Sequence, residues 1–205
     1  IILYEADIRV ADRYLMERFV YGAVEFLALQ DFDDTPQIVI ENAQIRPCQF
    51  RTTFTSLSID IECNEHEELF SIALAGEGLN VVLLLCPPRF VGQTLQGQED
   101  SAYELITVES EKVLLEAFFS YLTSYDPDII LGWNVKQFDM AVLERRARAN
   151  SLKYAIGRHG REASVRQWED QTLVDVPGRC VIDGIEALKT MTYQFESFSL
   201  DHVSE

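Results

Sequence analysis

Apolar and polar side chains alternate along residues 57–62, with the two-residue period of a β-strand that is buried on one face. Two more strand-sized apolar stretches, residues 69–75 and 79–86, follow after short polar links. Links of a few residues connect antiparallel neighbours, whereas a parallel partner needs a longer crossover. The sequence therefore predicts an antiparallel meander of three strands over residues 57–86.

Helical spacing follows along residues 110–125, where apolar side chains recur every three or four positions. Ser110 precedes this pattern and is a suitable N-cap, because its hydroxyl can accept a hydrogen bond from a free N–H of the first turn. We predict a helix that begins after Ser110 and ends before Asp126-Pro127. Its apolar positions are Val113, Leu114, Ala117, Phe118 and Tyr121.

A short apolar run, residues 129–131, predicts a buried strand that ends at Gly132. A second helix is predicted over residues 137–150, with an apolar face opposite a face of arginines. The apolar face consists of Met140, Leu143 and Ala147. A meander followed by helix, strand and helix predicts an α/β domain with a mixed sheet.

The first fifty residues mix short apolar stretches with charged ones and differ from the rest. We predict a strand at residues 37–41 and a change of element at Pro47. The predicted boundary lies near residue 50, so that residues 1–50 are part of an N-terminal domain and residues 51–205 form a second one. Because no initiator Met opens the chain, we expect it to belong to a longer protein.

The end of the chain is harder to interpret. Residues 151–178 are polar, and we expect them to be irregular, with a hairpin that touches DNA as the open alternative. Residues 179–185 predict another strand, and residues 198–205 predict the first turns of a helix.

Charge and cysteine content exclude several function classes. Seventeen basic and thirty-four acidic residues give a net charge of −17, which argues against a module that holds duplex DNA by its phosphates. It does not exclude an enzyme that binds phosphate through metal ions, because those ions reverse the local charge. The four cysteines form no C-x-x-C pair, which argues against a zinc or redox motif and favours a reducing, cytoplasmic location. No apolar run is long enough for a membrane span, so no membrane partner is expected.

Asp60 and Glu62 are the first candidates for chemistry. Side chains two positions apart on a strand point to the same face, roughly 6.6 Å apart along it. Two such carboxylates can bind one divalent cation or share a pair of them. The alternative interpretation is a solvated strand face without function.

Asn134 and Asp139 are the second set of candidates, in a loop that follows the predicted strand and enters a helix. Loops at the carboxyl ends of strands are where open α/β sheets place ligands. The alternative is that Asn134 forms a turn and Asp139 complements the helix dipole.

Together the two sets resemble motifs of the family B DNA polymerases. Asp60-Ile61-Glu62 resembles the Exo I motif, and Asn134-x-x-x-Phe138-Asp139, with its approach over residues 126–133, resembles Exo II. Segments 13–19, 178–189 and 198–200 also resemble segments of bacterial members, so the resemblance covers nearly the whole chain.

The resemblance implies a ribonuclease H-like fold and a proofreading 3′→5′ exonuclease. In such a site Asp60 would bridge two Mg²⁺ ions (or Mn²⁺), Glu62 would bind the first and Asp139 the second. Asn134 and Phe138 would lie near the single-stranded 3′ end of DNA. The implied partners are the remainder of a polymerase chain that replicates or repairs DNA in the nucleoid and, through it, a sliding clamp.

One motif of the family is missing. None of the eight tyrosines is followed by Asp four residues on, so the expected Tyr-x-x-x-Asp motif (Exo III) should lie beyond Glu205. Two alternatives therefore stay open: a scaffold segment with an inert site, and a free-standing nuclease. Asp183 is interpreted as a turn former at a strand end, with a supporting role at the site as its alternative, and the basic run 145–148 as a solvated helix face.

Overall fold

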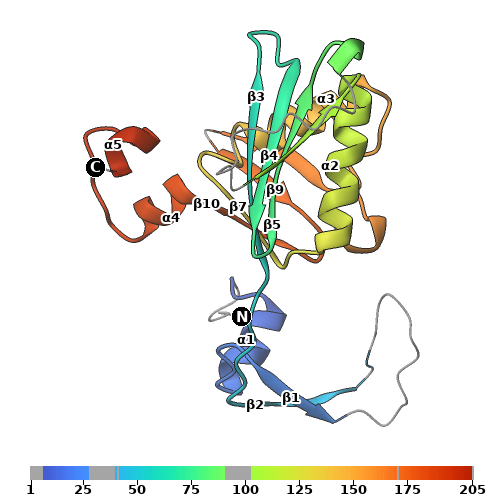
Figure 1. Ribbon diagram of the computed structural model, residues 1–205. Coiled ribbons are helices and arrows are strands. Elements are labelled where there is room, and N and C mark those ends of the chain that lie inside the picture. Colours follow the sequence, from blue (N-terminus) through green and yellow to red (C-terminus); the bar gives the residue numbers. More distant parts are fainter. Residues whose placement is uncertain (1–6, 28–39, 41, 91–102, 170, 205) are drawn as a thin grey trace. The chain divides into compact units, whose positions relative to one another are not determined.

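The computed structural model describes residues 7–27, 40, 42–90, 103–169 and 171–204. The chain divides into two compact units, Ile1–Thr53 and Phe54–Glu205 (Figure 1). No helix in the described ranges has the length and apolarity that crossing a membrane requires.

In its described residues, the first unit contains a helix and a pair of antiparallel strands. Helix α1 (Val10–Glu17) is followed by strand β1 (Val24–Leu27), which pairs antiparallel with β2 (Gln44–Pro47). An exposed ion pair between Arg46 and Glu25 joins these two strands at 2.7 Å. The strand that we predicted at residues 37–41 falls outside the described residues, except for Ile40.

The second unit is built on a six-stranded mixed sheet with the order β10-β7-β3-β4-β5-β6. Its centre is the predicted meander, confirmed as β3 (Ser56–Cys63), β4 (Leu69–Gly76) and β5 (Leu79–Leu85) in antiparallel pairing. Strand β7 (Ile129–Gly132) runs parallel to β3, and β10 (Cys180–Asp183) runs parallel to β7. The mixed α/β class predicted from the sequence is confirmed.

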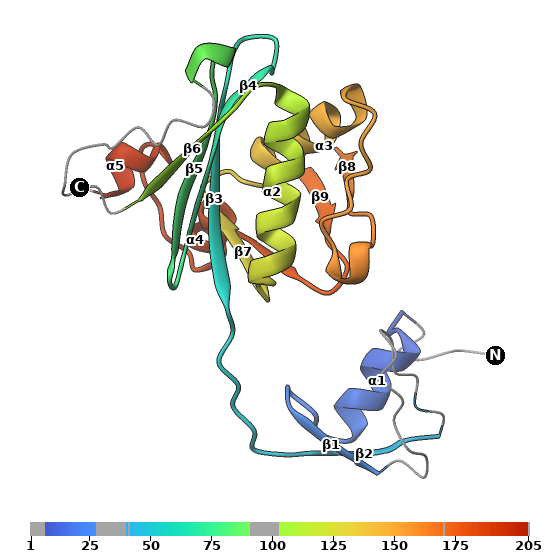
Figure 2. The same ribbon diagram turned by 45° about the vertical axis from the view of Figure 1, so that its right-hand side comes forward.

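Two helices cover one face of this sheet, α2 (Glu111–Tyr125) and α3 (Asp139–Ala149) (Figure 2). Ser110 caps α2 as predicted, with its hydroxyl oxygen accepting the Val113 N–H at 3.4 Å. The core lies between helices and sheet and contains Leu57, Ile59, Ile61, Ile72, Leu74, Leu83, Leu114, Phe118, Leu122, Met140, Leu143 and Ala147. Short helices α4 (Gly184–Thr190) and α5 (Leu200–Ser204) lie on the other side of the sheet in both views.

Several predictions for this unit were incomplete or wrong. Strand β6 (Glu104–Val108) was not predicted, because only its last two residues are buried and its pattern does not alternate. Residues 151–178 are not irregular: they include the 3₁₀ turn η2 (Arg158–Gly160) and an antiparallel hairpin of β8 (Ser164–Trp168) and β9 (Gln171–Asp175). A further 3₁₀ turn, η1 (Pro88–Phe90), follows β5.

The predicted strand over residues 179–185 stops at Asp183, because the Asp183 side chain caps α4 and starts a helix there. The arginine face of α3 is also less solvated than predicted. Arg146 is half-buried and forms two hydrogen bonds, of 2.7 and 2.5 Å, with Glu111 at the start of α2. This pair fixes the two helices to each other, so the interpretation of Arg146 as a freely solvated residue was wrong.

Candidate active site

Asp60 and Glu62 lie on β3 and point away from the helical face of the sheet. Leu57, Ile59 and Ile61 alternate with them and are buried in the core, which confirms the predicted facing. The residues opposite them on β4 are small, Ala73 for Asp60 and Ser71 for Glu62. A hollow of about 300 Å³ next to Asp60 lies on this face. Both carboxylates therefore have open space in front of them.

Asp139 approaches the same strand from α3, where it is the first helical residue and only 2 % exposed. The parallel pairing of β3 with β7 extends only from Ser56 to Ser58, so β3 continues past the end of its partner. There Asp139 Oδ1 accepts the Ile61 N–H at 3.1 Å, from 78 residues away in the sequence. The carboxylate takes the place that a backbone carbonyl of β7 would have had, and it lies beside the acid pair.

The loop between β7 and α3, residues 133–138, makes this approach possible. Gly132 allows close packing: a Cβ there would lie 2.6 Å from Val135 Cβ and 3.0 Å from the Ile59 carbonyl oxygen. Asn134 takes a left-handed conformation with φ 58°, which asparagine tolerates better than most residues. Its carbonyl accepts the Phe138 N–H at 3.0 Å and so joins the loop to the start of α3.

The negative charges of the candidate site are not compensated by ion pairs with the described residues. Burial, helped by the charges of Asp60 and Asp183, raises the pKa of Asp139 to about 7. Within the described residues, no lysine, arginine or histidine forms an ion pair with Asp60, Glu62 or Asp139. A buried carboxylate without a cationic partner disfavours its own ionised form, and a bound cation would remove that penalty.

The donor set suits a hard divalent cation, because carboxylate oxygens are the ligands that Mg²⁺ and Mn²⁺ prefer. Asp60 and Asp139 are close enough for their charges to interact. In the described part of the chain, however, no three His, Cys, Asp or Glu side chains are gathered as a metal centre requires. Asp60 and Asp139 fit a cation by charge and by chemistry.

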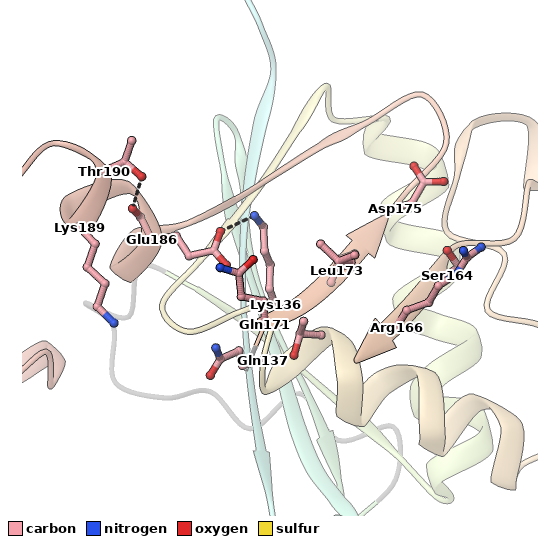
Figure 3. Close-up of a pocket in the computed structure, with 12 residues that line it drawn as sticks. Lys136, Gln137, Ser164, Arg166, Gln171, Leu173, Asp175, Glu186, Lys189 and Thr190 are labelled. Carbon is pink, nitrogen blue, oxygen red and sulfur yellow. Dashed lines mark hydrogen bonds and ion pairs between the residues drawn. The ribbon is translucent and has the colours of Figure 1, made fainter. Parts of the chain in front are cut away.

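The other predicted residues lie on the loop beside Asp139. Asn134 is half-buried, and Phe138 is 42 % exposed. Next to them is a polar cleft of about 800 Å³ between the loop, the β8–β9 hairpin and α4 (Figure 3). The sequence did not indicate this cleft, because α4 was not predicted and a hairpin within residues 151–178 was only an open alternative.

Asp183 is the most informative residue that we had not assigned to the site. It is buried, and both its oxygens accept backbone hydrogen bonds, from Ile185 and Glu186 on one side and from Lys136 in the loop on the other. The predicted role as a turn former is confirmed by its capping of α4. Nothing in the sequence indicated the bond to Lys136, which joins segments far apart in the chain.

Comparison with known proteins matches this arrangement to a family. Residues 2–203 match the model of "DNA polymerase family B, exonuclease domain". The chain belongs to this family. It is 37% identical to DNA polymerase II of Escherichia coli (strain K12) over 209 residues, which is 100% of this chain and 25% of that protein.

Archaeal relatives of this exonuclease domain are more distant. DNA polymerases of Desulfurococcus sp. (strain Tok) and Thermococcus sp. (strain 9oN-7) are 26% and 29% identical, each over 99% of this chain and 22% of the relative. The chain thus spans about a quarter of the length of the polymerases that it matches. The ribonuclease H-like exonuclease fold expected from the sequence is confirmed by the family match and the mixed sheet. Exonuclease domains of this family generally depend on metal ions.

Proposed function

We propose that this exonuclease domain proofreads DNA by removing the 3′-terminal nucleotide, with Asp60, Glu62 and Asp139 as its catalytic carboxylates. One observation carries the proposal: the buried carboxylate of Asp139 lies against β3, beside Asp60, without a cationic partner in the described residues. A structural role alone would not require two acids close together and uncompensated.

Asp60, Glu62 and Asp139 would hold the Mg²⁺ or Mn²⁺ ions, two of them once the fourth carboxylate of a Tyr-x-x-x-Asp motif is present. When bound, such ions lower the pKa of an attacking water and neutralise charge on the leaving oxygen. The backbone N–H of Ile61 holds the carboxylate of Asp139 against β3, between the positions of Asp60 and Glu62 in the strand. Its pKa near 7 means that it gives up a proton when a cation binds.

Asn134 and Phe138 would bind the end of the DNA strand. The exposed ring of Phe138 offers a surface on which a terminal base can stack, and such stacking does not depend on sequence. A mismatched end frays more easily than a paired one, so a site that takes single strands selects errors.

The whole protein, in this proposal, is a DNA-directed DNA polymerase in replication or repair, and the rest of its chain binds the duplex and any sliding clamp. The net charge of −17 supports this division of labour, because such a surface repels duplex phosphates. The second candidate is an inert scaffold segment. It is favoured by the absence of a gathered three-acid centre in the described ranges.

The test is digestion of a 5′-labelled single-stranded oligonucleotide with Mg²⁺ or Mn²⁺. It uses the full-length protein and an Asp60→Ala copy. We expect stepwise shortening from the 3′ end, lost in the variant. Equal shortening by both proteins, or none by either, would favour the scaffold.

A further inference from the structure

The turn between β10 and α4 holds the β7–α3 loop at several points. Asp183 Oδ2 accepts the Lys136 N–H at 3.1 Å. Lys136 Nζ forms an ion pair of 2.5 Å with Glu186 Oε2 (Figure 3). Trp133 packs against Gly184, where a Cβ would lie 2.6 Å from the indole ring. The indole N–H of Trp133 also donates to the Phe198 carbonyl at 3.0 Å. The loop that carries the Exo II residues is therefore fastened to the chain that follows the site in sequence.

Asp183 is the centre of this attachment. Parallel pairing places it opposite Gly132, at the end of β7, and it is only 3 % exposed. Its Oδ1 accepts the Ile185 and Glu186 N–H groups at 2.9 and 3.4 Å, which caps α4. Its other oxygen, Oδ2, accepts the Lys136 backbone N–H. Asparagine or serine offers a single acceptor oxygen, so either could cap α4 but could not also hold the loop.

A shift at Lys136 would be transmitted to Asp139. The Asn134 and Val135 carbonyls accept the Phe138 and Met140 N–H groups at 3.0 and 2.8 Å, so the loop and the first turn of α3 form one hydrogen-bonded unit. The backbone of that unit is held from outside at two points: Asp139 accepts the Ile61 amide, and Asp183 accepts the Lys136 amide. The side chains of Lys136 and Trp133 add contacts with Glu186 and Phe198. Loss of the Asp183 bond would remove the only one of these contacts that holds the backbone in the middle of the described loop, so that residue positions on either side of Lys136 can shift.

We propose that Asp183 is a positioning residue of the exonuclease site, which sets the place of Asn134, Phe138 and Asp139 by accepting the Lys136 amide. The inference rests on the proposed exonuclease function. It gives a role in catalysis to a residue that touches neither substrate nor metal ligand by hydrogen bond.

The experiment compares Asp183→Asn and Asp183→Ser with Asp128→Asn in the full-length protein. Asp128 is a matched control, because it lies just before the opposite end of β7 and its carboxylate also accepts a backbone amide, that of Thr55 at 2.9 Å. The readouts are kcat and KM for a single-stranded 3′ end per folded molecule, and hydrogen exchange of the Lys136 and Ile185 amides. We expect both Asp183 variants to lower kcat about 10- to 100-fold, with KM changed less than about twofold.

The two amides separate positioning from simple folding. In Asp183→Asn, exchange should become faster at Lys136 and stay slow at Ile185, whereas Asp128→Asn should keep both the wild-type kcat and the Lys136 protection. Unchanged kcat in the Asp183 variants, or lowered kcat with Lys136 still protected, would overturn the inference. If Asp60→Ala keeps its activity, the proposed function fails instead, and the amide exchange still decides whether Asp183 holds the loop.

Discussion

The two ends of strand β7 carry the same residue type in opposite electrostatic states. Before its first residue, Asp126 and Asp128 pair with Arg158 at 3.1 and 2.8 Å, and Asp126 also pairs with Arg179 at 2.7 Å. Burial would raise the pKa of Asp126, but hydrogen bonds from the two arginines lower it below its ordinary value. Beyond the other end of β7, burial raises the pKa of Asp139 to about 7.

The difference teaches how to separate structural from functional carboxylates in this fold. Before the first residue of β7, the carboxylates that hold segments together have their counter-charge within the protein, in Arg158 and Arg179. A carboxylate that awaits a ligand lacks that counter-charge and is destabilised until the ligand arrives. If this contrast holds, substitutions at the two ends of β7 should have different consequences.

The largest effect on the rate of digestion is expected when an aspartate beyond the end of β7 is replaced by asparagine, compared with the same replacement before its first residue. Asp139→Asn should lower the rate of 3′-end shortening by about 10²–10³-fold, as does removal of one group that stabilises a transition state. Asp128→Asn should leave that rate within about threefold. Rates are measured by single-turnover digestion of a labelled oligonucleotide. Similar rates for the two variants would remove the distinction between the ends.

At the end of β7 where Arg158 and Arg179 pair with aspartates, a substitution should lower the stability of the fold rather than the rate of digestion. Arg179 is 2% exposed in its side chain and donates to Asp126 and to the Ile156 and Pro127 carbonyls. Arg179→Met removes the donor from the two carbonyls and leaves Asp126 with Arg158 alone, which should cost about 3 kcal/mol in the free energy of unfolding. Urea denaturation gives the value. A loss below about 1 kcal/mol would show that the network contributes little.

The carboxyl end should respond to pH and divalent cations. The pKa of Asp139 rises from 3.8 to about 7 on folding, so the folded state holds the proton between these values. Stability is then favoured at low pH and falls as the pH rises through about 7. Between about pH 5 and pH 8, without divalent cations, the wild type should lose about 2 kcal/mol more than Asp139→Asn.

The matched measurement is the melting temperature at pH 8 with and without Mg²⁺. Mg²⁺ should raise the melting temperature of the wild type and leave that of Asp139→Asn unchanged, because only the ionised acid gains from the cation. Parallel pH profiles of the two proteins would contradict the raised pKa.

The smallest effect concerns Phe138. Phe138→Ala should weaken binding of a single-stranded 3′ end by about 1 kcal/mol, or about fivefold in KM, through lost base stacking. Phe70→Ala is a suitable control, because Phe70 is similarly exposed, on β4. Equal KM values for both variants would argue against stacking at Phe138.

Local patterns in the sequence were enough to predict several features. The alternation along β3 placed Asp60 and Glu62 on one face and Ile59 and Ile61 in the core, because side-chain direction on a strand follows from position alone. The bounds of α2 followed equally from its apolar spacing and from Ser110.

Only the tertiary structure decided which distant segments meet. The bond from Ile61 to Asp139 exists because β7 ends while β3 continues, and no short stretch of sequence specifies where two parallel strands stop pairing. The hydrogen bond from the Lys136 amide to Asp183 Oδ2 likewise depends on β10 lying beside β7, which the local sequence does not indicate. Hydrophobic period reports local burial, whereas the candidate site depends on the order of strands in the sheet, which is settled by the packing of the whole chain.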